Sequence, residues 1–376
     1  MPAMHAHVDP DGLLEYSVVY TDRALNHMSA RFQDVMREIL ARLKEVYSAD
    51  AVAVVPGSGT FGMEAVARQF ATDRRCLIVR NGWFSFRWTQ ILDTGRIASA
   101  STVLKARPVE SGPQPAFAPA PIEEVVDRIA SEKPDVVFAP HVETSAGIIL
   151  PNDYVSRVAE AVHAAGGLFV LDCIASGAMW IDMKACGVDV LVSAPQKGWT
   201  GSPCAGLVMM NEAAAERAAE TTSTSFACDL GKWLEIMRAY EGGAHAYHAT
   251  MPTDGLATFR DSMRLTQQFG FDAARSAQQE LGDRVRALLA GKGFKSVATD
   301  GFGAPGVIVS YTDDPDMKTG RPFAAQGLQI AAGVPLQCDE PDTFQTFRIG
   351  LFGLDKLQNV DRTVGRLEEA LEGMGA

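Results

Sequence analysis

The chain has 376 residues, 47% of them hydrophobic and 21% charged, and a formal net charge of −12. This length and composition predict a globular protein of two domains, or of one large domain with a smaller one. The acidic balance argues against a nucleic-acid partner, because phosphate backbones are bound by clustered Lys and Arg. No apolar run reaches the ~18 residues that would span a bilayer, so we expect no membrane partner.

The cysteines form no C-x-x-C pair, so we predict no zinc site and no other metal site. Several lie in apolar runs, where reduced core thiols are the usual state, and this favours a cytoplasmic location. The N-terminal segment lacks the apolar stretch of a signal peptide, so we expect none. The six cysteines are Cys76, Cys173, Cys186, Cys204, Cys228 and Cys338.

Helical and extended patterns alternate along the first part of the chain. Helical spacing of apolar residues predicts helices at 28–43, 61–70, 84–94, 122–131 and 153–165. Short apolar runs predict strands at 52–55, 76–79, 101–104, 135–139, 168–171, 188–193 and 205–210, and the proline-rich stretch 108–121 is typical of a surface loop. This alternation indicates an α/β fold, a mostly parallel sheet between two helical layers.

The C-terminal part has a different pattern. Residues 254–289 are helical in character and could link the sheet to a smaller α+β unit with strands at 294–298, 306–311 and 347–349 and a closing helix at 355–371. We therefore predict an N-terminal arm at 1–25, a large domain at 26–260 and a small C-terminal domain at 261–376.

Two residues at strand ends indicate the chemistry. The run at 188–193 leads into a turn with Lys197, and the run at 168–171 ends in Asp172. A lysine can bind the aldehyde of pyridoxal phosphate as a Schiff base, and an aspartate can pair with the ring nitrogen. Taken alone, a loop lysine is usually solvated and such an aspartate often caps a helix. The interpretation therefore depends on other parts of a cofactor site.

A turn and an aromatic pair could supply those parts. Gly57 to Thr60 join a strand to a helix, and Ser58, Gly59 and Thr60 suit a phosphate at the helix start, although a plain turn would look the same. No G-K-[ST] follows, so this is not a Walker loop. Trp83 or Phe84, after the next strand, could stack on a pyridine ring or simply belong to the core.

Two further residues could complete the site. Thr144, after the strand at 135–139, could hydrogen-bond the ring hydroxyl or the region of Asp172, or could only stabilise a turn. Arg348 stands inside an apolar run, where a buried charge needs an anionic partner. That partner is either a substrate carboxylate, which guanidinium binds through two parallel hydrogen bonds, or an internal carboxylate.

Five segments, in order, resemble the class V, fold-type I pyridoxal-phosphate aminotransferases, and most of all their alanine–glyoxylate and serine–pyruvate branch. The similarity runs from about Met28 to the C-terminal helix. The segments are E-[ST]-S-x-G at 143–147, D-x-x-A-S at 172–176, S-x-x-Q-K at 193–197, Y-H-x-T-x-P at 247–252 and R-I-G-L-x-G at 348–353.

The resemblance implies a role for each matching residue. Lys197 would be the Schiff-base lysine and Asp172 the partner of the ring nitrogen, with Ile174 and Phe84 on the two ring faces. Arg348 would bind the substrate carboxylate. The phosphate would be bound by Ser58, Gly59, Thr60 and Gln196, and by Tyr247 and Thr250 of a second subunit, which implies a homodimer with shared active sites.

The resemblance also implies a reaction. Such an enzyme would move an amino group from a small L-amino acid, alanine or serine, to a small 2-oxo acid, with glyoxylate as the expected acceptor. The branch usually opens with a segment rich in proline and glycine, which is missing at 16–23, so the substrate pair stays open. Arg23 or His27 could contact the substrate instead, or belong to a polar surface.

Two rival functions fit the same fold. A cysteine desulfurase or lyase would use Cys338, ten positions before Arg348 (348 − 338), as its nucleophile. Such enzymes usually carry histidine directly before the lysine, where this chain has Gln196, and neighbouring acids should keep the thiol protonated. The second rival is a non-catalytic protein on this fold, which would not need Lys197, Asp172 and Arg348 together.

Overall fold

In the computed structural model, which describes residues 13–375, seven strands form the central sheet. Their order is β1-β11-β10-β9-β6-β2-β3, and only β11 runs antiparallel to its neighbours. The mostly parallel sheet of the predicted α/β fold is confirmed. The strands are β1 (Ala51–Pro56), β2 (Arg75–Arg80), β3 (Ala100–Lys105), β6 (Val136–Pro140), β9 (Leu168–Asp172), β10 (Val190–Ser193) and β11 (Ala205–Met210).

Helices cover both faces of this sheet. Every residue of β6, β9, β10 and β11 is buried, as expected for continuous apolar runs between two helical layers. Each fully buried Val or Leu side chain contributes about 1.5–3 kcal/mol to stability. The helices of this part are α1 (Ala30–Tyr47), α2 (Gly59–Phe70), α3 (Trp83–Gly95), α4 (Ile122–Glu132), α5 (Asn152–Ala164), α6 (Met183–Cys186), α7 (Glu212–Glu220) and α8 (Leu230–Glu241).

Helix α1 illustrates how the sequence determines these elements. The Ser29 hydroxyl accepts a hydrogen bond from the backbone N–H of Phe32 and so caps the helix start. Apolar residues at helical spacing then form one fully buried stripe, and Ser48 ends the helix in the left-handed conformation. The stripe consists of Phe32, Val35, Met36, Ile39, Leu40, Leu43 and Tyr47.

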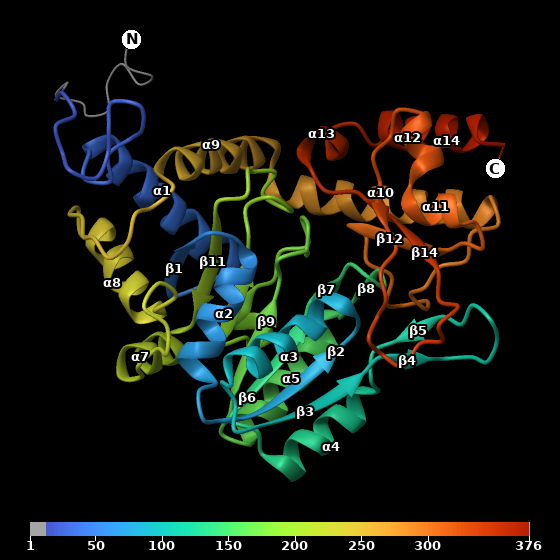
Figure 1. The fold of residues 1–376 in the computed structure, drawn as a ribbon, viewed down its shortest axis with the longest axis horizontal. Helices are drawn as coiled ribbons and strands as arrows, with labels where there is room; N and C mark the ends of the chain where they lie inside the picture. Colours follow the sequence, from blue (N-terminus) through green and yellow to red (C-terminus); the bar gives the residue numbers. More distant parts are fainter. Residues whose placement is uncertain (1–12, 376) are drawn as a thin grey trace.

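The chain after residue 250 builds a second, smaller sheet (Figure 1). Helices α9 (Thr253–Phe269) and α10 (Phe271–Gly291) lead to an antiparallel sheet in the order β12-β14-β13. Figure 1 shows the orange-to-red elements gathered at one end of the molecule. They are β12 (Val307–Tyr311), α11 (Pro315–Thr319), α12 (Arg321–Ala325), β13 (Ala331–Ala332), β14 (Thr346–Gly350), α13 (Leu354–Leu357) and α14 (Val360–Gly373).

Several predicted elements need correction. Residues 294–298 form no strand: only single bridges at Ser296 and Ala298 occur there. The predicted helical stretch 254–289 is two helices, because Gly270 adopts a positive φ of 96° between them. The proline-rich segment contains a short hairpin, β4 (Arg107–Pro108) with β5 (Phe117–Ala118), and a second hairpin pairs β7 (Val142–Glu143) with β8 (Ile148–Ile149).

The predicted domain boundaries stay a prediction. Residues 1–12 of the N-terminal arm lie outside the described residues. The boundary predicted between 260 and 261 falls within α9, the helix that precedes the smaller sheet unit. In residues 13–375, no helix is long and apolar enough to cross a membrane.

Candidate active site

A cavity of about 380 Å³ lies at the carboxyl edge of the parallel strands, where ligands of such sheets bind. The register explains the convergence: Asp172, at the end of β9, lies opposite Pro140 of β6 and Val192 of β10. Ten of the twelve predicted site residues line the cavity: Ser58, Gly59, Thr60, Phe84, Thr144, Asp172, Ile174, Gln196, Lys197 and Arg348.

Lys197 and Asp172 face this cavity from neighbouring strand ends. The Lys197 Nζ lies 5.0 Å from the ring centroid of Phe352. Burial and the charge of Arg348 lower the pKa of Lys197, which favours the neutral amine. Burial raises the pKa of Asp172 to about 7, although its carboxylate accepts a hydrogen bond of 2.9 Å from the backbone N–H of Ile174.

The turn before α2 places Ser58, Gly59 and Thr60 in the lining of the cavity. Gly57 adopts a φ of 123°, which glycine tolerates best, and the Ser58 side chain makes no capping hydrogen bond to α2. Gly59 must be small, because a Cβ there would lie 2.6 Å from Cδ1 of Ile174. The start of α2 is therefore available to an anion.

The aromatic residue that lines the cavity is Phe84, whereas the Trp83 ring packs against Phe86 at 5.8 Å between centroids. The buried Glu143 fixes the start of α3, a role that the sequence did not reveal. Its carboxylate accepts hydrogen bonds from the backbone N–H groups of Phe84 at 3.2 Å and Ser85 at 2.8 Å. A carboxylate at a helix N-terminus also complements the helix dipole.

Two arginines flank the Phe84 ring, each with its guanidinium carbon 5.5 Å from the ring centroid. Arg348 donates from Nε to the carbonyl of Ala332 at 2.7 Å and from Nη1 to that of Thr144 at 3.4 Å. It forms no ion pair with a carboxylate of residues 13–375. The second, Arg87, lines the cavity and donates to the Thr60 hydroxyl at 3.1 Å. Sequence analysis missed it.

The other predicted residues lie outside the cavity lining. Tyr247 and Thr250 are exposed, and their hydroxyl oxygens lie 3.1 Å apart. Arg23 and His27 are not among the described residues that line the cavity. Cys338 is 3% exposed, and its Sγ lies 3.5 Å from the carbonyl oxygen of Arg80. Burial raises the pKa of this thiol to about 12, so it does not suit the nucleophile of a desulfurase.

Comparison with known proteins identifies the family. The family model described as aminotransferase class-V matches residues 13–300. The chain belongs to the class-V aminotransferases. This aminotransferase is 30% identical over 358 residues to a 2-aminoethylphosphonate–pyruvate transaminase of Burkholderia mallei, covering 92% of this chain and 90% of the relative. A transaminase of the same name from Paraburkholderia phymatum is 29% identical over 355 residues, covering 92% and 89%.

Solved structures show the same fold. The ureidoglycine–glyoxylate aminotransferase of Bacillus subtilis aligns with a TM-score of 0.78 at 22% identity, covering 94% of this chain and 88% of that one. An alanine–glyoxylate aminotransferase of a Nostoc species gives 0.77 at 22% identity, covering 93% and 89%. The predicted fold class and the resemblance to class V aminotransferases are confirmed, and the aminotransferase is a pyridoxal-phosphate-dependent transaminase.

The residues of the cavity fit this cofactor. The buried side-chain oxygen of Gln196, Oε1, lines the cavity without a hydrogen-bond partner among the described residues. A buried polar atom of this kind needs a partner, and a ligand in the cavity can supply it. Within the described part of the chain, no group of three or more His, Cys, Asp or Glu side chains is placed to hold a metal ion.

Proposed function

We propose that this aminotransferase moves the amino group of a small L-amino acid, alanine or serine, to a small 2-oxo acid, with glyoxylate as the acceptor. The observation that carries the proposal is Arg348, a partly buried cation in the Lys197 cavity whose hydrogen bonds go to carbonyl oxygens alone. A substrate carboxylate would supply the missing negative charge through two parallel hydrogen bonds. Phe352 and Ala331 also line this cavity, and its volume of about 380 Å³ has to hold the cofactor and the substrate together, which favours small substrates.

The cofactor would be held by residues of this chain. Lys197 would bind it covalently, and Asp172 would lie at the ring nitrogen, where a protonated ring would keep the carboxylate ionised. Phe84 and Ile174 would pack on the two ring faces, with Thr144 beside the ring. The phosphate would lie at the start of α2, bound by Ser58, Gly59, Thr60 and Gln196, which all line the cavity.

When bound, pyridoxal phosphate supplies an electron sink that makes the Cα–H bond of the amino donor acidic. The protein then has to move one proton. Lys197, whose pKa is lowered by burial, can accept the Cα proton of the donor and later return a proton to Cα of the acceptor. Arg348 would hold the substrate carboxylate so that Cα stays within reach of the Lys197 amine.

A second donor–acceptor pair is favoured by two observations. The relatives at 29% and 30% identity are 2-aminoethylphosphonate–pyruvate transaminases. In addition, the cavity holds a second arginine, Arg87, beyond the one expected for a carboxylate. A phosphonate, with its larger negative charge, suits two guanidinium groups better than one. We therefore keep 2-aminoethylphosphonate with pyruvate as the alternative substrates.

We further propose a homodimer in which Tyr247 and Thr250 reach the cofactor phosphate of the partner subunit. Both are exposed and lie outside the cavity of their own chain. Phe226 and Phe61 are 77% and 51% exposed, and large apolar side chains at a surface favour an interface. A cytoplasmic location is supported by the six cysteines, all buried and free.

A substrate panel tests this proposal. Alanine, serine and 2-aminoethylphosphonate are each paired with glyoxylate and with pyruvate, and 2-oxo acid or aldehyde formation is measured. We expect the highest kcat/KM with alanine or serine and glyoxylate. Arg348→Met should lower this kcat/KM about a hundredfold, because one partner of a buried charge pair is lost, and Arg348→Lys should recover part of it.

A higher kcat/KM with 2-aminoethylphosphonate and pyruvate would make these the substrates in place of alanine or serine and glyoxylate. No transamination with any pair, or an Arg348→Met variant as active as the unmodified enzyme, would contradict the proposed substrate site.

A further inference from the structure

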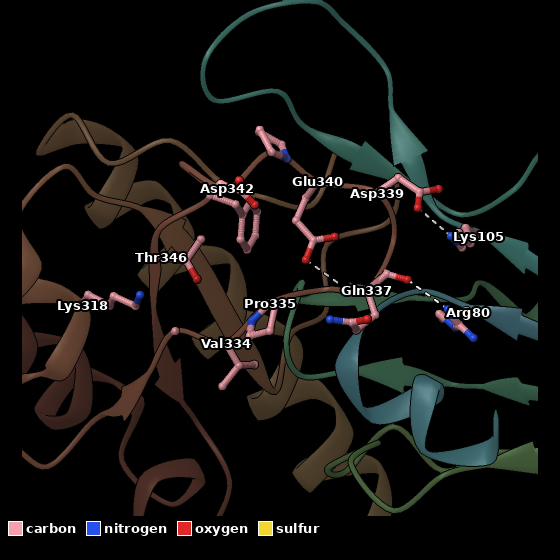
Figure 2. Close-up of a pocket in the computed structure, with 13 residues that line it drawn as sticks. Arg80, Lys105, Lys318, Val334, Pro335, Gln337, Asp339, Glu340, Asp342 and Thr346 are labelled. Atoms are coloured by element: carbon pink, nitrogen blue, oxygen red, sulfur yellow. Dashed lines mark hydrogen bonds and ion pairs between the residues drawn. The ribbon is translucent and has the colours of Figure 1, made fainter. Parts of the chain in front are cut away.

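A second cavity, of about 480 Å³ (Figure 2), shares no lining residue with the cavity that Lys197 lines. Its walls are the ends of β2 and β3, with Arg80 and Lys105, and the segment 333–346 together with Lys318 of α11. None of the twelve predicted site residues lines it. The proposed transamination does not use this second cavity, so the residues that line the second cavity need a separate explanation.

Two deeply buried side chains of this lining each have one polar atom without a hydrogen-bond partner among the described residues. Arg80 is 7% exposed; its Nη1 donates to the carbonyl of Gln337 at 3.1 Å and its Nη2 to the Thr89 hydroxyl at 2.8 Å, but its Nε has no acceptor. Thr346 is 1% exposed, and its Oγ1 is also unpaired. Buried polar atoms are normally hydrogen-bonded, so both indicate a missing ligand or solvent partner.

The charges around this cavity divide into paired and unpaired groups. Lys105 pairs with Asp339 at 2.6 Å. The carboxylate of Glu340 accepts three backbone N–H groups of its own loop, at 2.6, 3.0 and 2.8 Å. In contrast, the half-buried Lys318 and the exposed Asp342 have no side-chain partner within residues 13–375. Among the described charged residues of the lining, the side chains of Lys318 and Asp342 are therefore the ones without a hydrogen-bond or ion-pair partner.

Figure 2 shows Lys318, Thr346 and Asp342 on the same side of the cavity. The cavity therefore offers the ammonium of Lys318, the hydroxyl of Thr346 and the carboxylate of Asp342. These groups are complementary to a molecule that carries one negative and one positive charge. The carboxylate of a zwitterion would accept from Lys318 and Thr346, and its ammonium would donate to Asp342. A dianion is disfavoured, because the acids Asp339, Glu340 and Asp342 line the same cavity.

We propose that this cavity is a binding site for a small zwitterionic α-amino acid, separate from the catalytic cavity. The site goes beyond the proposed function, because its occupant would not react. Its position gives it a physical link to catalysis: segment 333–346 connects β13 to β14, and β13 supplies the Ala332 carbonyl that holds Arg348. The backbone of Gly333 packs tightly against that of Thr346, since a Cβ on Gly333 would lie 1.9 Å from the carbonyl oxygen of Thr346.

The test uses the holoenzyme and N,N-dimethylglycine, a zwitterion whose tertiary amine cannot form an imine with the cofactor. Binding is measured by titration calorimetry. We expect saturable binding that Lys318→Met and Thr346→Val each weaken about tenfold, because each removes a hydrogen bond to a charged group. Arg348→Met, which removes the carboxylate site of the catalytic cavity, should retain this binding.

The control is Lys232→Met, which removes a lysine of α8 that pairs with Glu235, outside both cavities. It should bind like the unmodified enzyme. Thermal unfolding of each variant checks that the fold is retained. The proposal would be overturned by an absence of binding, by equal binding in Lys318→Met and the unmodified enzyme, or by binding that disappears in Arg348→Met alone. Because the assay needs no turnover, its failure is distinguishable from failure of the proposed transamination.

Discussion

Burial disfavours the ionised form of the Asp172 carboxyl group, and the protonated ring of a bound cofactor would favour it. Burial, and more weakly the nearby Glu143, raise its pKa to about 7, against the lowering effects of the hydrogen bond from the Ile174 N–H and of the charge of Arg87. In an unfolded chain an aspartate has a pKa of about 3.9. The folded, cofactor-free protein therefore binds this proton more tightly than the unfolded chain does. The resulting stabilisation is fully present below about pH 3.9 and is lost as the pH rises through about 7.

Asp172→Asn removes this titration. We expect the free energy of unfolding of the cofactor-free variant, relative to the unmodified protein, to rise by about 2–3 kcal/mol between pH 5 and pH 8. Urea unfolding at the two pH values measures it. The exposed Asp300→Asn is the matched control and should show no such change. A difference for Asp172→Asn that does not vary with pH would contradict the buried-carboxyl explanation.

At the residue scale, the sequence predicts the side chains that belong to recognisable motifs. It does not predict the side chains that support those residues through contacts in the folded structure. Lys197 and Asp172 stand at the ends of apolar runs and Arg348 stands inside one, where the chemistry of the residue type is informative by itself. Arg87 is one turn along α3 from Phe84, in a helical pattern where an arginine is ordinarily solvated. Glu143 acts on the start of α3 by accepting from the backbone N–H groups of Phe84 and Ser85, 59 and 58 residues away in the chain, which no local pattern reveals.

At the scale of elements, the junction of β1 and α2 depends on a close approach that only glycine permits. Gly59→Ala would place a Cβ 2.6 Å from Cδ1 and 2.9 Å from Cγ1 of Ile174, so Ile174 must move into the cavity. We expect the dissociation constant for pyridoxal phosphate to rise about tenfold or more, equivalent to about 1.4 kcal/mol. Absorbance titration of the cofactor-free protein measures it.

Gly291→Ala is the control for this substitution, because a Cβ there meets nothing within 4 Å. It should leave the cofactor affinity unchanged. Equal affinity in Gly59→Ala and the unmodified protein would mean that the turn is not part of the cofactor site.

The predicted elements succeed where the apolar pattern is continuous. All seven strands of the central sheet were predicted, and six of them are largely buried apolar runs with few alternative interpretations; the edge strand β3 is mostly exposed or half-buried. The segment 294–298 fails because its apolar residues pack beside β12 without forming a ladder, a result of tertiary contacts. Helix α7 was not predicted because its buried stripe consists of alanines, which carry a weak periodic signal.

At the scale of the whole molecule, the proposed active site is shared between two chains. Sedimentation should give twice the chain mass of 40.4 kDa. A mixing experiment tests whether the active sites are shared. Lys197→Ala and the double variant Tyr247→Ala, Thr250→Ala should each be nearly inactive. Their mixed dimer has one intact site, so random reassociation of equal amounts should restore about a quarter of the full activity.

The matched control replaces the double variant with a second portion of Lys197→Ala, which should restore nothing. An absence of recovery with the double variant, at a dimeric mass, would show that Tyr247 and Thr250 do not complete the partner's site.

Reductive trapping of the cofactor tests whether Lys197 forms the covalent bond to pyridoxal phosphate. Borohydride reduces the bond between pyridoxal phosphate and its lysine, and peptide mapping then identifies the labelled residue. The account predicts a single labelled peptide that carries the modification on Lys197, and its loss in Lys197→Ala. A label on a different lysine, or no label on a protein that has bound the cofactor, would contradict the account.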